Sequence, residues 1–459
     1  MERLMTVILA AGEGKRMKSK HSKVSHRFCG KALVEWVYSA AKGAGSDECI
    51  VVVGHKADEV RELLGEKVLY ALQESQLGTG HAVMQADEYL KGKDGYVMVL
   101  YGDTPLITAE TLKKTVEFHS RNNNSATLIT AVLDDPAGYG RIIRNAEGNV
   151  IRIVEDKDAN ADEKAIKEAN PGMYCFNARD LVMALKELNN NNSQGEYYLT
   201  DTLEILVKKG MKVGAIPVED NREILGINDR VQLAHAAEIM RRRILERHMR
   251  LGVTIMDPSS VHIDGDVEIG TDTIVYPGTI MEGSVKIGED CIIGPNSRIT
   301  SSVIGNGVEI NNSVVVDSTV GDGTHVGPFA YIRPGSCIGR KVKIGDFVEI
   351  KKSIIGDKTK ISHLTYVGDA EVGRNVNLGC GVVVVNYDGS KKHKTVIGDN
   401  AFIGCNVNLV SPVDIKNNSY IAAGSTITED VPESSLAIAR SRQVVKEGWV
   451  EKKGLKRTE

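Results

Sequence analysis

Residues 263–293 read IDGDVEIGTDTIVYPGTIMEGSVKIGEDCII, and large apolar residues recur in them at every sixth position. The same period returns twice further along the chain. Neither an α-helix nor an ordinary strand pair repeats after six residues. A parallel β-helix does, because each short face points one apolar side chain into a shared core before the chain turns a corner. The repeating residues are Ile263, Ile269, Val275, Met281, Ile287, Ile293 and Ile299, then Val320, Val326, Ile332, Ile338, Ile344 and Ile350, and finally Ile397, Ile403, Leu409, Ile415, Ile421 and Ile427.

The six-residue period divides the chain into three parts. Residues 252–459 hold the β-helix and a C-terminal tail, and residues 230–251 have apolar residues at helical spacing, which predicts a connecting helix. Residues 1–229 alternate short apolar runs with helical stretches, which is typical of a parallel sheet wrapped by helices. Residues 386–394 interrupt the repeat and predict a loop that leaves the coil, a place where function is often found. Strands are expected at residues 5–9, 49–53, 96–100 and 126–132, with a helix over residues 34–44.

Composition argues against several classes of partner. The chain has 57 Lys and Arg against 61 Asp and Glu, a net charge of −4, which favours neither nucleic acid nor an anionic membrane. The arginines between residues 241 and 250 permit a nucleic-acid surface, but a solvated helix face fits the net charge better. Seven cysteines without a C-x-x-C pair indicate a reducing compartment, and the chain has no apolar run long enough to span a bilayer. We therefore expect a cytoplasmic protein without membrane insertion.

A glycine-rich turn follows the first expected strand, over residues 9–17. Its small residues let the backbone approach a phosphate closely, and the N–H groups of a following helix would point toward that phosphate. Taken alone, the turn is equally well explained as a tight connection. Arg16 within the turn and Lys23 beyond it strengthen the phosphate interpretation, since their charges match a triphosphate.

Asp103 ends another expected strand, the apolar run that begins at Tyr96. Ligands of open α/β sheets bind at the carboxyl ends of strands, so this carboxylate is well placed for a metal ion. A helix N-cap just before Pro105 explains it equally well. Gln73 precedes a further glycine-rich turn, residues 76–82, that opens a helix.

Together these motifs resemble the sugar-1-phosphate nucleotidyltransferases. The matching segments are residues 9–17, Lys23, residues 76–82 and residues 101–103, followed in order by residues 138–142, Glu155, residues 170–174 and residues 226–230. Joined to the β-helix, nearly the whole chain is similar to the bacterial family of bifunctional N-acetylglucosamine-1-phosphate uridylyltransferase/glucosamine-1-phosphate acetyltransferases. The resemblance implies a Rossmann-like α/β nucleotidyltransferase domain followed by a left-handed parallel β-helix of hexapeptide repeats.

The resemblance also implies two reactions. The C-terminal half acetylates glucosamine-1-phosphate with acetyl-CoA, and the N-terminal half transfers UMP from UTP to the product, giving UDP-N-acetylglucosamine for cell-wall synthesis and pyrophosphate. It implies Mg²⁺ on Asp103 and Asn228, triphosphate stabilisation by Arg16 and Lys23, and a homotrimer through the β-helix. It places UTP and the nucleotide sugar against Leu9, Ala10, Ala11, Gly12, Lys23, Gln73, Gly78, Thr79, Tyr101, Asp103, Gly140, Glu155, Asn170 and Asn228.

In the C-terminal half, acyl transfer to an amine needs a base, and His363 is the expected one. The backbone amide of Tyr387 would donate to the thioester oxyanion. The resemblance assigns glucosamine-1-phosphate to Arg333, Lys351, Tyr366, Asn377 and Lys392, and acetyl-CoA to Cys380, Asn386, Tyr387, Cys405, Ala423 and Arg440. A zinc site on His325, His363 and His393, as in γ-type carbonic anhydrases, is disfavoured because these histidines lack that motif's close pair.

The chain departs from the family pattern at several positions. Lys15 replaces the usual Thr, Ser22 and Ala32 replace Pro, and Ser25 replaces Leu. Loss of a proline predicts a looser Lys23 loop, by roughly 0.4–1 kcal/mol, and a weaker uridylyl site. Cys380 and Cys405 stand where Ala and Ser are usual, which raises a ping-pong acetyl-enzyme as an alternative; no pairing with His or Asp is visible for either thiol, so direct transfer is favoured.

Two rival functions keep the fold but change the chemistry. The first is a single-activity sugar-1-phosphate nucleotidyltransferase whose β-helix is purely structural. His363, Lys351 and the loop 386–394 argue against it, since a scaffold has no use for them. The second is a regulatory subunit with an inactive site, which the charged residues of the N-terminal half, Arg16, Lys23 and Asp103 among them, argue against.

Overall fold

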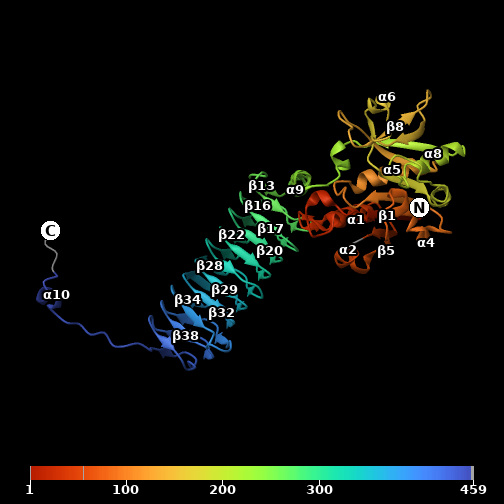
Figure 1. The fold of residues 1–459 in the computed structure, drawn as a ribbon. Helices are drawn as coiled ribbons and strands as arrows, with labels where there is room; N and C mark the ends of the chain where they lie inside the picture. Colours follow the sequence, from red (N-terminus) through yellow and green to blue (C-terminus); the bar gives the residue numbers. More distant parts are fainter. Residues whose placement is uncertain (1, 55, 456–459) are drawn as a thin grey trace. The chain divides into compact units, whose positions relative to one another are not determined.

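The computed structural model describes residues 2–54 and 56–455, and the chain divides into two compact units, Met1–Met240 and Arg241–Glu459. The division falls inside helix α9 (Arg230–Arg250), which occupies the segment predicted as a connecting helix, so each unit contains part of it (Figure 1). Among the described residues, no helix combines the length and apolar character needed to cross a membrane.

The first unit is built on one mixed sheet. Strands β1, β4 and β6 pair in parallel, and β12 pairs in parallel with β7, but β11 runs antiparallel to both β6 and β7. In sheet order the strands are β5 (Leu69–Leu72), β4 (Glu48–Val53), β1 (Leu4–Ala10), β6 (Tyr96–Tyr101), β11 (Tyr174–Asn177), β7 (Ala126–Val132), β10 (Glu168–Asn170), β8 (Gly140–Arg144) and β9 (Val150–Val154), with β12 (Val213–Pro217) beside β7.

The expected strands are therefore present, and the α/β sheet that the alternating pattern predicts is mixed, with antiparallel strands beside the parallel ones. Strands β7 to β11 follow one another with little helix between them, and a parallel pairing needs a long crossover connection. The helices of the unit are α1 (Leu33–Gly43), α2 (Ala57–Leu64), α3 (Thr79–Met84), α4 (Asp87–Leu90), α5 (Ala109–Arg121), α6 (Ala161–Lys164), α7 (Ala178–Leu185) and α8 (Asp201–Lys208).

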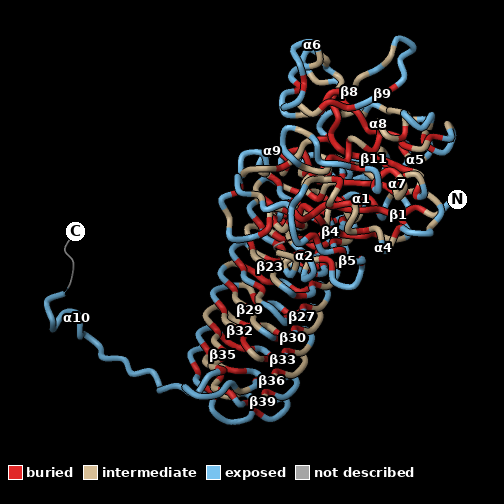
Figure 2. The backbone as a smooth tube through the Cα atoms, turned by 45° about the vertical axis from the view of Figure 1, so that its right-hand side comes forward, coloured by how far each residue is buried: buried red, intermediate tan, exposed pale blue. Residues whose placement is uncertain are grey.

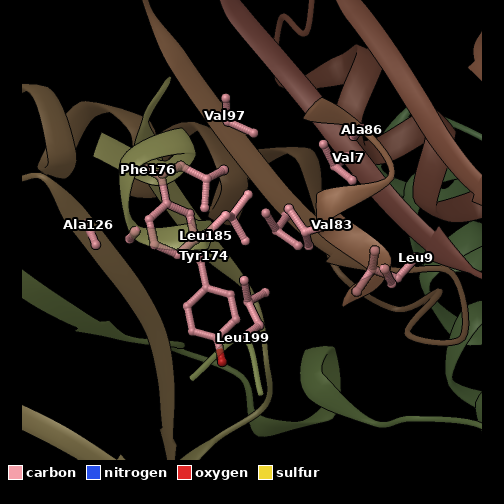
Figure 3. Close-up of a cluster of buried hydrophobic side chains, with 14 of the residues drawn as sticks. Val7, Leu9, Val83, Ala86, Val97, Ala126, Tyr174, Phe176, Leu185 and Leu199 are labelled. Atoms are coloured by element: carbon pink, nitrogen blue, oxygen red, sulfur yellow. The ribbon is translucent and has the colours of Figure 1, made fainter. Parts of the chain in front are cut away.

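Both faces of this sheet are buried. Along β1, Val7 and Leu9 belong to one apolar cluster and Ile8 and Ala10 to the other, because successive side chains of a strand point to opposite faces. In the first cluster, Figure 3 shows Phe176 beside Leu185. Burial on both faces makes β1 a rigid support for the glycine-rich turn that follows it.

The second unit is a left-handed parallel β-helix with three long parallel sheets. Every residue of the six-residue period is buried, and Figure 2 shows buried and exposed positions alternating along the coils. The strands nearest the functional residues are β26 (Tyr331–Ile332), β28 (Lys343–Asp346), β29 (Glu349–Lys351), β31 (Lys360–His363), β32 (Tyr366–Gly368), β34 (Asn377–Leu378), β35 (Val383–Val385), β36 (Thr395–Ile397), β37 (Phe402–Ile403), β40 (Tyr420–Ile421) and β42 (Leu436–Ala437).

Where the period slips, the coil continues with shorter faces. Buried Ile304, Ile310, Val315 and Val320 follow one another at intervals of six, five and five residues, and the parallel pairing carries on across them. The six-residue count therefore missed core positions without misplacing the β-helix. The predicted loop over residues 386–394 is present between β35 and β36, and most of it is exposed.

The burial pattern gives a direct stability test in β19 (Ile292–Ile293). Ile293 is fully buried, whereas its neighbour Ile292 is 41% exposed. We expect Ile293→Ala to lower the free energy of unfolding by about 2–5 kcal/mol, because it leaves a cavity in the core. Ile292→Ala, the matched control, should cost well under about 1 kcal/mol. Urea unfolding of both variants measures this, and equal losses would contradict the predicted inward direction of the repeat.

Candidate functional sites in the two units

The first unit has a cavity of about 300 Å³ at the carboxyl ends of β1 and β6. Parallel neighbouring strands end at one edge of the sheet, so the turns that follow them meet there. This cavity brings together most of the residues predicted to bind UTP. Its lining consists of Leu9, Ala10, Ala11, Gly12, Lys23, Val24, Gln73, Gln76, Gly78, Thr79, Ala82, Tyr101, Asp103 and Glu196.

Lys23 forms the electrostatic centre of this cavity. Its ammonium group forms an ion pair with Asp103 and donates a hydrogen bond to Oδ1 of Asn228 over 3.2 Å. The Lys23 and Asp103 side chains are only 14% and 17% exposed, so water screens this pair weakly. The alternative role of Asp103 as a helix N-cap is wrong, because the next helix, α5, is capped by the Thr108 hydroxyl. Two oxygens, from Asp103 and Asn228, therefore converge on one cation.

Arg16 is the predicted catalytic residue that this cavity does not include. It lies in the short 3-10 helix η1 (Lys15–Met17), and its side chain is exposed. The glycine-rich turn also borders a second hollow of about 300 Å³ next to the first, lined by Ala10, Ala11, Gly12, Glu13, Gly14, Lys15, Ser19, Ser22, Gly54 and Lys56.

A second group of predicted residues lies on the other side of Tyr101. Burial raises the pKa of the Tyr101 hydroxyl, and the nearby charges of Glu155 and Asp103 raise it further. Burial also raises the pKa of Glu155, whose carboxylate accepts a hydrogen bond from the Thr200 hydroxyl over 3.1 Å. Tyr101 thus lies between the cavity and a polar region suited to a sugar.

Asn170 and Gly140 complete that region. The Asn170 side chain donates to the Tyr174 hydroxyl over 2.7 Å and accepts from the backbone N–H of Gly172 over 3.1 Å. A β-carbon at Gly140 would lie 2.8 Å from Cγ2 of Ile153, too close for a real contact, so a larger residue here would displace the strand that leads to Glu155. Asn170 is 7% exposed, and its hydrogen bonds hold it in one orientation.

In the β-helix, His363 is paired with a carboxylate that the sequence reasoning missed. His363 ends β31 and Asp346 ends β28, in direct register one coil apart, with Nδ1 of His363 2.5 Å from Oδ1 of Asp346. The imidazole holds the pKa of Asp346 below its usual range. The contact sets the ring orientation and directs the other ring nitrogen, Nε2, away from Asp346. His363 is 55% exposed, so a substrate can reach it.

The predicted cations of the β-helix also pair with carboxylates one coil away. Arg333 forms an ion pair with Glu349 over 2.6 Å, and Lys351 forms one with Asp369 over 3.4 Å. The ammonium group of Lys392, in the exposed loop, lies beside that of Lys351, and this neighbour lowers the pKa of Lys392. Two adjacent ammonium groups form a site that an anion would stabilise.

Asn386 ties the start of the exposed loop to this cluster. Its side-chain amide donates to Asp369 over 2.5 Å and lies 3.4 Å from the Tyr366 hydroxyl. Asp369 therefore accepts from both Lys351 and Asn386, and it joins the loop to the coil. The far end of the loop is closed by His393, whose Nε2 lies 2.6 Å from the Asp388 carboxylate.

Three of the residues predicted to bind acetyl-CoA, Cys380, Cys405 and Ala423, form a column that continues from His363, whereas Asn386 and Tyr387 lie in the loop 386–394. The backbone carbonyls of His363, Cys380 and Cys405 each accept a hydrogen bond from the next coil, over 3.3, 2.7 and 2.8 Å. Ala423 occupies the same corner one coil further on, and Arg440 follows β42 close to it. Asn377 lies on β34, one coil after β31, the strand that His363 ends.

Asp346, Glu349 and Asp369 had a signal in the sequence. Each lies 16 to 18 residues from its partner, the length of one coil. The period that predicts the fold therefore also predicts which side chains lie next to each other on successive coils. The zinc hypothesis finds no support, since His325, His363 and His393 each face a carboxylate of their own, and the described residues include no cluster of three or more His, Cys, Asp or Glu that could hold a metal.

Comparison with known proteins agrees with this architecture. Residues 5–226 match the family model for nucleotidyl transferases, and residues 266–301, 317–352 and 394–429 match the model for the bacterial transferase hexapeptide. A protein of Acetivibrio thermocellus named bifunctional protein GlmU is 71% identical over the whole of both chains. The chain belongs to the GlmU family of bifunctional proteins.

Two further GlmU proteins extend the match. That of Caldanaerobacter subterraneus subsp. tengcongensis is 61% identical and covers 99% of both chains, and that of Clostridioides difficile is 57% identical and covers 98% of both. GlmU membership confirms the resemblance found in the sequence, the predicted fold class and the prediction of an enzyme with two transferase activities. The single-activity and regulatory rivals are not supported, because the relatives at this identity are named bifunctional.

Proposed function

We propose that each unit catalyses one of two consecutive transfers. The β-helix acetylates glucosamine-1-phosphate with acetyl-CoA, and the first unit transfers UMP from UTP to the product, releasing pyrophosphate and UDP-N-acetylglucosamine. The observation that carries this proposal is the pairing of His363 with Asp346 on the same stretch of β-helix as the cations Arg333 and Lys351. The Lys23–Asp103 pair in the other unit supports the second transfer.

In acetyl transfer, the amine of the sugar attacks the thioester carbonyl carbon, and the C–S bond then breaks. His363 takes the proton from the attacking nitrogen at Nε2, since Nδ1 is engaged by Asp346. Arg333, Lys351 and Lys392 bind the sugar phosphate, with Tyr366 and Asn377 on the sugar. Acetyl-CoA lies along Cys380, Asn386, Tyr387, Cys405, Ala423 and Arg440.

In uridylyl transfer, a phosphate oxygen of the acetylated sugar attacks the α-phosphorus of UTP, and pyrophosphate leaves opposite to it. This chemistry depends on positioning and charge neutralisation. Lys23 and Arg16 stabilise the triphosphate and the departing pyrophosphate. The uracil is read by Gln73, Gly78 and Thr79, and the acetylated sugar is held by Gly140, Glu155 and Asn170.

A Mg²⁺ ion fits the point where the oxygens of Asp103 and Asn228 converge. Both already contact a single cation, the Lys23 ammonium, and Mg²⁺ is commonly held by one or two protein oxygens together with substrate phosphates. When bound, the ion would neutralise the charge that develops on the phosphates. With the ion on Asp103 and Asn228, the Lys23 ammonium would be available to contact the triphosphate.

We further propose a cytoplasmic homotrimer that assembles through the β-helix. Phe329, Phe347 and Leu364 follow one another on successive coils and are more than half exposed. The rings of Phe329 and Phe347 stack with their centres 5.4 Å apart. An exposed apolar ladder next to His363 favours a neighbouring copy of the chain as its cover, since soluble proteins rarely leave such patches open.

Two single substitutions separate the activities. We expect the Asp103→Ala variant, given glucosamine-1-phosphate, acetyl-CoA, UTP and Mg²⁺, to accumulate N-acetylglucosamine-1-phosphate, because acetyl transfer proceeds and uridylyl transfer does not. His363→Ala should slow acetyl transfer by about 10²- to 10⁴-fold, the usual contribution of a general base, yet still make UDP-N-acetylglucosamine from supplied N-acetylglucosamine-1-phosphate. Mass spectrometry of the products measures both. Unimpaired acetylation by the His363 variant would contradict the proposal.

Metal removal should affect only one reaction. With excess EDTA, uridylyl transfer should fall to background, because the phosphates lose their counter-charge, while acetyl transfer by the same sample should be unchanged. Adding Mg²⁺ back should restore the first rate. The two rates can be followed as pyrophosphate release and as free CoA thiol, and undiminished pyrophosphate release in EDTA would disprove the assigned metal site.

A further inference from the structure

Lys23 is presented by a short loop whose conformation no regular sheet or long helix maintains. It opens the 3-10 helix η2 (Lys23–Ser25), a single turn preceded by Ser22. Two backbone hydrogen bonds lie inside this turn: Ser25 to Ser22 over 3.2 Å, at the long end of the normal range, and His26 to Lys23 over 3.4 Å, beyond that range. The position of the Lys23 ammonium therefore depends on contacts from outside the turn.

Glu59 of α2 supplies those contacts. Its Oε2 atom accepts a hydrogen bond from the backbone N–H of Ser22 over 2.8 Å and lies 2.8 Å from the Ser25 hydroxyl. The same hydroxyl lies 2.8 Å from the Ser22 carbonyl oxygen, so its proton is shared between two acceptors. One carboxylate thus contacts the residues on both sides of Lys23 and Val24.

Glu59 contacts the loop as a charged, partly buried carboxylate. The Glu59 side chain is 31% exposed, and His21 approaches its other oxygen to 3.5 Å. Burial alone would raise the pKa of the Glu59 carboxyl, but the hydrogen bonds from Ser22 and Ser25 outweigh burial and hold the pKa below its usual range. Glu59 is therefore ionised at neutral pH, and hydrogen bonds to a charged acceptor are stronger than neutral ones.

The two departures from the family pattern supply the two donors. The φ angle of Ser22 is −57°, a value that proline also adopts, so proline would fit the backbone but would lack the N–H that reaches Glu59. Leucine in place of Ser25 would lack the hydroxyl. The sequence predicted a looser loop from the lost proline; in the structure the serines hold the loop through Glu59.

We propose that Glu59 is a positioning residue for uridylyl transfer, which holds the loop 22–25 so that the Lys23 ammonium stays at Asp103 and Asn228. The inference rests on the proposed function of the first unit. Glu59 acts only through the loop, so its loss should reduce the rate of the chemical step more than the binding of UTP.

The test compares Glu59→Ala and Glu59→Gln with Glu62→Ala, an exposed glutamate on the same helix. We expect Glu59→Ala to lower kcat for uridylyl transfer by roughly 10- to 100-fold, the scale of a misplaced catalytic group, with a much smaller change in KM for UTP. Glu59→Gln keeps an oxygen acceptor and should recover most of kcat. Glu62→Ala should match the native protein, and acetyl transfer by every variant reports that the chain is folded.

A second comparison restores the residues of the family pattern, proline at position 22 and leucine at position 25. In the background Ser22→Pro with Ser25→Leu both donors are gone, so adding Glu59→Ala should cost little further kcat. An equal loss in both backgrounds would overturn the inference, as would unchanged kcat for Glu59→Ala in the native background. If the native protein made no UDP-N-acetylglucosamine at all, the proposed function would fail instead, so the two failures are distinguishable.

Discussion

The structure of the second unit depends on the hydrogen bonding of each β-helix coil to the next. Over residues 333–369, parallel pairing between coils holds a residue close to the one 16 to 18 positions further along the chain. The same constraint buries the apolar period and sets Asp346 against His363 and Asp369 against Lys351. A polar site is thereby assembled on a rigid scaffold without a long loop, and only residues 386–394 are added to it. Placement of His363 and its partner on a rigid scaffold is a form of preorganisation.

In the first unit a different constraint, the shared edge of parallel strands, assembles the site. The parallel strands β1 and β6 end at one edge, and the segments that follow them bring the glycine-rich turn, Lys23 and Asp103 to a single cavity. Residues outside the cavity lining support the predicted site residues by hydrogen bonds. Thr200 bonds to Glu155, Tyr174 bonds to Asn170, and Glu59 bonds to the loop that carries Lys23. Such contacts fix the orientation of side chains that charge alone would leave mobile.

Sequence reasoning predicted the parts of the structure that repeat or that lie on buried strands. The six-residue period identified core positions in the β-helix, and short apolar runs identified β1, β4, β6 and β7. It did not predict the antiparallel insertion of β11, because strand direction depends on pairings distant in the sequence. It also missed Glu59, whose partners lie 34 and 37 residues away with no repeat to indicate the pairing, and Asp346, whose one-coil spacing from His363 is a signal in the sequence. Arg16 was predicted from its charge within the glycine-rich turn and from the family resemblance, and the structure places it in η1, exposed and outside the cavity lining.

We infer that coil register makes His363 and Asp346 one functional unit. The most direct measurement is a double-mutant cycle on acetyl transfer with Asp346→Ala, His363→Ala and the combined variant. If Asp346 acts only by orienting the imidazole, the combined variant should be no slower than His363→Ala alone, because the losses are not additive. Losses that multiply would contradict the account, since Asp346 would then act independently of His363.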